Sequence, residues 1–319
     1  MRHTLLTGLA GLSFAIGAPA YAQDMGTAVP DPAAQTTPAP YEPAPTTYDQ
    51  APAATTTADP VTEETPFSGL YVGGSFGYDV QPNDVGSSVL FDRNLDGQFG
   101  DTVLTGGGAN AFSRGFCNGP ATGANAPGFG GTCSNDRDGI GYYGRIGADF
   151  QRGKIVVGVL GDFGTSKIRD TVSAFSTTPA NYVLSRELDW EASIRGRLGF
   201  VAGRSTLFYG AFGPGYANID RDFRSSQSTN TFTQSGKRRQ FGIVGGGGVE
   251  QMIGNNFSVG LEYMYHQYQD DDFRVRVAGP AGTPFTNAAN GGTATGTDFA
   301  RSDDMFRWHS IRATAAFRF

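Results

Sequence analysis

The sequence predicts an all-β protein, an eight-stranded antiparallel transmembrane β-barrel with long extracellular loops and short periplasmic turns. Three observations support this fold class. Eight segments have the length and composition of strands, and seven of them alternate apolar residues with polar or small ones at a period of two, as half-buried strands do. The connections between these segments alternate strictly between long and short. No run of about 18 apolar residues is present that would cross a bilayer as a helix.

The composition agrees with such a fold. The 319 residues include 47 Gly, 24 Phe and 13 Tyr, which suits closely packed strands with many aromatic anchors. The formal net charge is −6 and the pI is near 5.1, so no nucleic-acid partner is expected.

The N-terminal part predicts export. Residues 1–22 contain an apolar core from Leu5 to Ile16 and a small-x-small site at Ala20-Tyr21-Ala22, the pattern of a secretory signal peptide. Residues 23–66 hold nine of the 17 prolines together with many Ala and Thr. Such a segment buries too little apolar surface to order itself, so it is expected to be a disordered periplasmic linker. The predicted barrel occupies residues 67–319.

The first four predicted strands each set apolar residues against small or charged ones. Leu70–Tyr78 comes first, and a short turn at 151–154 then joins Ile140–Phe150 to Ile155–Phe163. The fourth, Trp190–Phe200, alternates most clearly, because every second residue from Glu191 onward is charged or small. It is therefore the strongest strand prediction in the chain.

The last four strands follow the same rule with one exception. Leu207–Ile219 carries aromatic residues on both faces, so its faces stay unassigned. Gln240–Glu250, Phe257–Tyr265 and Ser310–Phe319 alternate as the others do. The long loops are then residues 80–139, 168–187, 220–239 and 269–304.

The connections also decide which face meets lipid. An even strand count with long loops at one end and short turns at the other is the layout of an outer-membrane barrel, whose apolar face is outside and whose interior is polar. Closure satisfies every backbone hydrogen bond where water is absent. Without closure, a strand edge would be left unpaired in the bilayer.

The predicted interior carries a balanced set of charges. Five basic and five acidic positions face inward: Arg145, Arg195, Arg197, Arg312, Arg318, Asp149, Asp162, Glu191, Glu250 and Glu262. Eight strands enclose only enough space for side chains, and buried charges need partners. The sequence therefore predicts an ionic plug in the lumen; the alternative is that some of these residues are solvated at the rims.

Several segments resemble one protein family. They are Asp189-Trp190 with Ile194 to Phe200, Leu207 to Gly210, and Gly245 to Glu250 with Asn255 to Ser258 and Leu261 to Tyr265. Together they resemble the small outer-membrane β-barrels of the alphaproteobacterial porin family, related in architecture to the outer membrane protein A barrel, over about residues 67–319. This resemblance implies a Gram-negative outer-membrane protein with structural, antigenic or adhesive roles and no established catalysis.

The chain closes with Phe317 and Phe319, which look like the C-terminal signal that the barrel-insertion machinery reads. Cys117 and Cys133 lie 16 positions apart, and in an oxidising compartment they read as one disulfide closing a loop, with two free thiols as the alternative.

Loop 1 contains a partial calcium motif. Asp92, Asn94 and Asp96 supply oxygens at alternate positions before Gly97, as in the start of an EF-hand loop. Val103 stands where a bidentate Glu is expected. A weak Ca²⁺ site is the hypothesis, a solvated turn is the alternative, and no other cofactor is expected.

The remaining polar features favour an envelope role. His309 and Ser310 are adjacent in a strand and point to opposite faces, so they do not form a catalytic pair and no enzyme is expected. The cluster Lys237-Arg238-Arg239 is placed to contact lipopolysaccharide phosphates, or is simply solvated. Five aromatic residues are expected in interfacial girdles: Tyr78, Tyr263, Tyr265, Tyr268 and Trp308.

The leading functional hypothesis is a structural barrel that displays four loops for surface interactions. Its expected partners are outer-membrane lipid, lipopolysaccharide and the barrel-insertion machinery. The first alternative is a narrow or oligomeric porin for small solutes. The second is an adhesin or ligand-capturing protein that acts through loops 1 and 4.

Overall fold

The computed structural model describes residues 65–82 and 86–319. The predicted signal peptide and the predicted linker up to residue 64 lie outside the described residues. Within the described part, no helix is long and apolar enough to cross a membrane.

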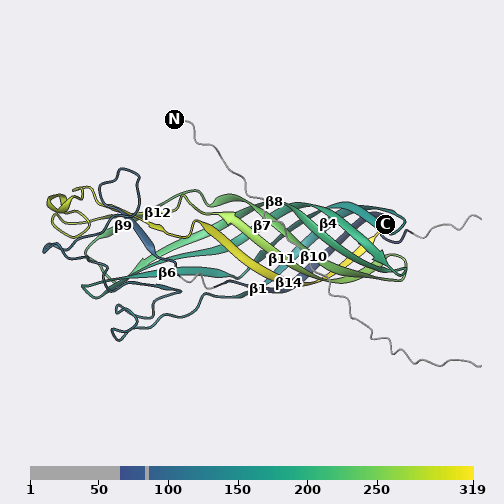
Figure 1. The fold of residues 1–319 in the computed structure, drawn as a ribbon, viewed down its shortest axis with the longest axis horizontal. Coiled ribbons are helices and arrows are strands. Elements are labelled where there is room, and N and C mark those ends of the chain that lie inside the picture. The colour runs from purple at the N-terminus through teal and green to yellow at the C-terminus, as the bar shows by residue number, and fades with distance from the viewer. Residues whose placement is uncertain (1–64, 83–85) are drawn as a thin grey trace, which may run out of the picture. The chain divides into compact units, whose positions relative to one another are not determined.

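Eight strands close into an antiparallel barrel, as the sequence predicts (Figure 1). Each strand pairs with the next around the barrel, and β7 pairs with β8 to complete the ring. The barrel strands are β1 (Gly69–Val80), β4 (Gly139–Arg152), β5 (Ile155–Ser166), β7 (Ala180–Ala202), β8 (Thr206–Ser225), β10 (Arg239–Ile253), β11 (Phe257–Gln269) and β14 (Met305–Arg318). The short connections lie at 153–154, 203–205 and 254–256.

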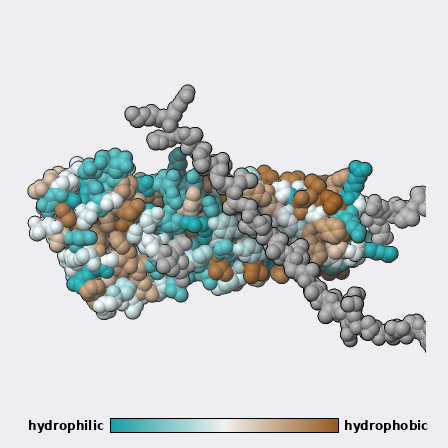
Figure 2. Space-filling view, viewed as in Figure 1, coloured by the Kyte–Doolittle hydropathy of each residue, from teal (hydrophilic) through white to brown (hydrophobic). Residues whose placement is uncertain are grey.

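The apolar face of the barrel points outward. Leu70, Ile146 and Ile194 are 63%, 66% and 65% exposed, whereas the inward Arg195 and Arg312 are each 1% exposed. Hydrophobic residues gather on the visible wall of the barrel strands (Figure 2). This arrangement suits a lipid environment, because burying the arginines and exposing the aliphatic residues is the reverse of what water favours.

The strand whose faces the sequence leaves unassigned, β8, follows the same rule. Phe208 and Phe212 are exposed on the outside, while Leu207 and Tyr209 are buried inside. Its partner β7 has a register irregularity between Leu188 and Trp190.

A run of four glycines in β10 makes room for large neighbours in the lumen. Gly246 and Gly248 face inward. A Cβ on Gly246 would lie 2.7 Å from Met264 Sδ, and one on Gly248 would lie 3.1 Å from Tyr209 Oη. The glycines therefore leave space for side chains that come from the two adjacent strands, β11 and β8.

The long loops contain strands of their own. β7 and β8 run beyond the predicted strands Trp190–Phe200 and Leu207–Ile219 into the predicted loops. β6 (Arg169–Ser176) pairs with β7 and with β3 (Phe116–Asn118). A separate four-stranded sheet follows the order β2 (Val89–Asp92), β13 (Thr297–Arg301), β12 (Arg274–Ala278) and β9 (Thr231–Ser235). A single turn of 3₁₀ helix, η1, covers Ala288–Asn290.

These elements build what we call the loop module, the described residues of segments 86–138, 167–188, 220–238 and 270–304. Its core contains buried aliphatic residues and a cluster of rings that includes Phe91, Phe112, Tyr182, Phe285 and Phe299. The rings contact one another at centroid distances of 4.5 to 6.1 Å. The loops thus form a hydrophobic core of their own, separate from the barrel interior.

The predicted disulfide is present. Cys117 and Cys133 are bonded to each other, with their Cα atoms 6.5 Å apart. Cys117 lies in β3, which pairs with β6. The disulfide therefore links β3 to a later segment of the same loop, around Cys133.

Candidate functional site

Three ionic clusters occupy the barrel interior, one above another. We call them the turn-end cluster (Asp149, Arg197, Glu250, Arg318), the middle cluster (Arg145, Asp162, Arg195, Glu262) and the loop-end cluster (Asp79, Glu191, His266, Arg312). Every one of these side chains is at least 90% buried. Whether the lumen is a plug or a channel depends on these three clusters.

In the turn-end cluster each arginine contacts both acids. Arg197 lies 2.8 Å from Asp149 and also contacts Glu250. Arg318 lies 2.9 Å from Asp149 and 2.8 Å from Glu250. The guanidinium of Arg318 also lies 4.5 Å from the ring centroid of Tyr71, a favourable cation–π distance.

The middle cluster repeats this arrangement. Arg145 lies 3.0 Å from Asp162 and 2.8 Å from Glu262, and Arg195 also contacts Asp162. Tyr209 donates a hydrogen bond of 2.8 Å to Glu262. Each charge therefore has at least one opposite charge in contact, as burial requires.

The loop-end cluster contains a histidine whose tautomer follows from its neighbours. Arg312 has only donors, so its contact of 2.9 Å with His266 Nε2 requires that nitrogen to accept. Nδ1 then carries the proton and donates to Glu191 at 3.0 Å. Tyr268 also donates to Glu191, at 2.9 Å. A neutral His266 thus fits between a cation and an anion without repelling either.

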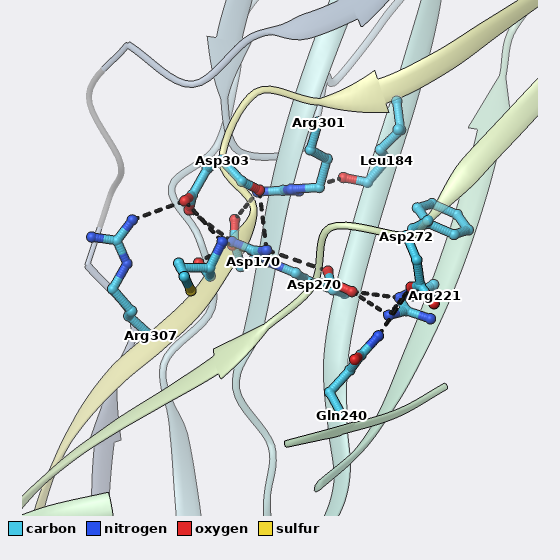
Figure 3. A network of polar contacts seen from close by, with 12 residues as sticks. Asp170, Leu184, Arg221, Gln240, Asp270, Asp272, Arg301, Asp303 and Arg307 are labelled. Atoms are coloured by element: carbon cyan, nitrogen blue, oxygen red, sulfur yellow. Dashed lines mark hydrogen bonds and ion pairs between the residues drawn. The ribbon is translucent and has the colours of Figure 1, made fainter. Parts of the chain in front are cut away.

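A fourth polar group, which we call the ionic belt, lies where the barrel meets the loop module (Figure 3). It consists of Asp170, Arg186, Arg221, Asp270, Arg301 and Asp303. Arg186 donates to Asp170 at 2.6 Å and to Asp303 at 2.8 Å, and it also reaches Asp270 at 3.3 Å. Arg221 donates to the other oxygen of Asp270 at 2.7 Å, and Arg301 donates to Asp170 at 2.6 Å. The belt joins β6, β7 and β8 to the segments at both ends of loop 4.

The electrostatics of the belt favour its charged form. Burial raises the pKa of the Asp170 carboxyl, but Arg186 and Arg301 lower it by more, so its pKa lies below the usual value. The Asp170 carboxylate is therefore ionised at neutral pH and stabilises the loops against the barrel.

The structure brings all ten sequence-predicted lumen residues together in the three clusters. It adds Asp79 and His266, so six carboxylates rather than five line this part of the interior. Both additions sit at the correct period-two positions but lie just past the predicted strand ends at Tyr78 and Tyr265. Extending the alternation further along β1 and β11 would have found them.

Two of the girdle predictions are wrong. Tyr268 and Trp308 are fully buried inside the barrel, where Trp308 stacks on His266 with ring centroids 4.6 Å apart. Trp308 lies on the same face of β14 as Ser310 and Arg312, because every second residue of a strand points the same way. This position in the strand, and not the residue type, decides that the side chain points inward. Tyr78 and Tyr263 do face outward.

The calcium candidate forms a hydrogen-bonded turn. Asp92 is buried and accepts hydrogen bonds from the backbone of Asp96 and Gly97, while Asn94 and Asp96 accept from nearby amides. Among residues 65–82 and 86–319, no three His, Cys, Asp or Glu side chains gather to hold a metal ion. The Ca²⁺ hypothesis stays a prediction.

The basic cluster Lys237-Arg238-Arg239 lies above a row of outward aromatic residues. With Tyr216, Asn218, Gln240 and Phe241, it lines a shallow cavity of about 660 Å³. Tyr216 contacts Phe241 and Trp190, with ring centroids 4.7 Å and 5.9 Å apart. Arg238 pairs with Asp220, and both side chains remain largely exposed.

Comparison with known proteins assigns the family. Residues 50–281 match the outer membrane protein beta-barrel domain. The chain belongs to this family. It is accordingly a protein of the Gram-negative outer membrane, with its aliphatic wall in the lipid and its loop module outside the bilayer.

Among characterised relatives, the 22 kDa outer membrane protein of Rhizobium leguminosarum bv. viciae is 32% identical over 145 residues, which is 45% of this chain and 60% of the relative. The 31 kDa outer-membrane immunogenic protein of Brucella melitensis is 25% identical over 111 residues, 35% of this chain and 46% of the relative. The chain thus spans less than two thirds of the relatives that it matches.

Among solved structures, outer membrane protein OprG of Pseudomonas aeruginosa matches with a TM-score of 0.45 at 14% identity, over 79% of this chain and 96% of OprG. The attachment invasion locus protein Ail of Yersinia pestis matches with a TM-score of 0.30 at 13% identity, over 79% of this chain and 99% of Ail.

Proposed function

We propose that this protein is a closed, non-conducting and non-enzymatic barrel that anchors a folded loop module at the cell surface for interactions outside the cell. One combined observation supports the proposal: a filled interior together with a folded set of loops. The interior is occupied by ion-paired clusters, and all four long loops share one apolar core. The first suits an anchor better than a channel, and the second suits a recognition surface.

The paired interior argues against the porin alternative. Arg145, Arg197 and Arg318 lie 2.8 to 3.0 Å from carboxylates. Arg195 contacts Asp162. To admit a solute, the lumen would have to break several buried ion pairs together, each costing about 3–5 kcal/mol when one partner is lost. A water-filled pore would require a wider barrel.

The positions of the two histidines in the described part of the chain support the proposal that the barrel is not an enzyme. His266 is buried between Glu191 and Arg312 inside the membrane barrel. His309 hydrogen-bonds Tyr263 at 2.6 Å on the outer wall, while Ser310 is fully buried on the opposite face. Neither histidine is placed to activate a nucleophile toward a substrate from solution.

We also propose lipopolysaccharide as a partner of the basic cluster. Phosphates near the headgroup would meet Lys237 and Arg239, while acyl chains would contact Phe241 and Tyr216 beneath them. A Lys237→Ala/Arg239→Ala variant should copurify with less lipopolysaccharide than the wild type. Equal amounts in a phosphate assay would contradict this contact.

The barrel-insertion machinery is the remaining proposed partner. Phe317 and Phe319 are both exposed on the outer wall, and their rings lie 5.2 Å apart. Phe319→Ala should reduce the amount of membrane-inserted protein, measured by fractionation; unchanged insertion would count against this reading.

Planar-bilayer recording tests the proposal as a whole. The reconstituted wild-type protein should show no discrete single-channel openings under conditions in which a porin control conducts. Openings that change with Arg195→Gln or Glu262→Gln, but not with the surface control Arg224→Gln, would show that the lumen conducts. That result would favour the porin alternative.

A further inference from the structure

A cavity in the loop module is built by all four long loops. Its volume is about 210 Å³. Its lining comes from residues 105 and 111 of loop 1, 176–178, 180 and 182 of loop 2, 227, 229 and 230 of loop 3 and 283–285 of loop 4. Such convergence is not needed to close the barrel. It occurs at the end of the molecule that is directed away from the membrane.

The floor of the cavity is apolar and partly aromatic. Tyr182 and Phe285 line it and are each 3% exposed, with ring centroids 5.8 Å apart. Ala111 and Ala180 are also buried there, and their small side chains leave the space open. The aromatic residues are held by the loop core, so the floor is formed before any ligand binds.

The rim is polar but uncharged. The hydroxyl groups of Thr177, Thr178 and Thr229 make no hydrogen bond to other residues that the structure describes. Among the lining residues, Gln227 Nε2 and Asn230 Oδ1 are buried atoms without a hydrogen-bond partner, and Asn230 Oδ1 lies next to Gly279. Buried polar atoms of native proteins are normally paired, so one donor and one acceptor here lack the partners that their burial calls for.

We propose that this cavity binds a neutral saccharide unit. A sugar ring presents an apolar C–H face, which suits the aromatic floor, and hydroxyl groups that both donate and accept, which suit the threonines and the two amides. No Asp, Glu, Lys, Arg or His lines the cavity. A charged ligand would therefore lose its hydration without gaining a counter-charge. The volume limits the bound part to about one ring.

This proposal names a ligand class for the surface interactions of the proposed function and rests on it. It is distinct from the basic cluster, in which Lys237 and Arg239 are proposed to contact phosphate on the outer wall. The two sites share no lining residue. A phosphate-bearing glycolipid and a neutral glycan should therefore be separable by mutation.

The test uses the full-length protein in lipid nanodiscs, which avoids sugar-based detergents. The probes are the methyl glycosides of glucose, galactose, mannose and N-acetylglucosamine, with glucuronic acid and glucosamine as charged comparisons. Saturation-transfer NMR detects binding, and titration calorimetry gives Kd. At least one neutral glycoside should bind saturably, and the charged comparisons should bind more weakly.

Gln227→Leu and Thr177→Val each remove hydrogen-bonding groups at nearly constant volume and should weaken binding about tenfold. Thr233→Val on the exposed β9 is the matched control and should change Kd less than about twofold. Absence of saturable binding by every neutral glycoside, or an equal effect of the control, would overturn the saccharide proposal. If bilayer recordings show no channel openings and no sugar binds, the proposed anchor role is retained and only the saccharide site is refuted.

Discussion

At the scale of single residues, the inward arginines and acids are the least replaceable part of the barrel. Arg145 contacts Asp162 and Glu262 with its side chain only 5% exposed. Removing one member leaves the others buried without full compensation, whereas an exposed pair is mostly solvated in either state. The same chemical change should therefore have very different effects inside and outside.

Arg145→Met should destabilise the folded barrel by about 3–5 kcal/mol. The control Arg224→Met breaks an exposed pair with Asp222 and should cost about 0–1 kcal/mol. Guanidinium unfolding of protein in lipid vesicles, followed by the fluorescence of Trp190 and Trp308, measures both. Equal stabilities of the two variants would mean that the middle cluster does not stabilise the barrel.

The sequence pattern predicts the direction of the charged lumen residues correctly but not that of two aromatic residues. The alternation in β7 placed Arg195 and Arg197 inside because their neighbours Ile194 and Leu198 are aliphatic. Residue type alone predicts Trp308 and Tyr268 in the girdle, but Trp308 lies on the same strand face as Arg312, and Tyr268 on the same face as Glu262, so both point inward. The position of a residue in a strand decides whether its side chain points into the lumen or toward the lipid. An aromatic ring is compatible with both environments.

At the scale of elements, the ionic belt links the barrel strands to the loop module. Asp170 of β6 contacts Arg186 of β7 and Arg301 at the end of β13. Arg301 additionally donates to the carbonyl of Leu184 at 3.1 Å. The belt therefore holds three elements in place with a single carboxylate at its centre.

The belt makes the stability of β6 depend on pH. The native pKa of Asp170 lies below its usual value because the effect of its arginine partners exceeds that of burial. Its stabilising contribution is thus complete above the unfolded pKa of about 3.9 and is lost as the pH falls through the lower native pKa. Hydrogen-exchange protection of β6 amides, corrected for intrinsic rates, should fall as the pH drops below about 4.

Asp222→Asn, in an exposed pair, serves as the control and should leave this pH profile unchanged. Asp170→Asn should lower protection already at neutral pH and flatten the profile. Protection in the wild type that stays constant over the acid range would contradict a role for Asp170 in holding β6.

At the scale of the whole molecule, the loops form part of the folded structure and are more than linkers. β2 pairs with β13, and β9 pairs with β12, so loops 1, 3 and 4 share one sheet. The disulfide adds a covalent constraint within loop 1. A surface built this way holds a fixed shape, which a recognition role requires.

Trypsin applied to intact cells should therefore cut at few places. Arg238 has a side chain that is 63% exposed, and it should be cleaved, whereas Arg186 and Arg301 are buried in the belt and should resist. Mass spectrometry of the fragments identifies the sites. The unboiled barrel should also migrate differently from the boiled protein on a detergent gel. Rapid cleavage at Arg186 in intact cells would mean that the loop module is not folded at the surface.

The sequence alone determined the eight strands, the outward and inward faces of seven of them and the charged character of the lumen. It could do so because a strand repeats every two residues and the membrane imposes one rule on all of them. Tertiary structure alone decided the loop module, the ionic belt and the cavity at its outer end. These depend on contacts such as Asp170 with Arg301 and Tyr182 with Phe285, between residues more than 100 positions apart, and no local pattern specifies which distant segments will meet.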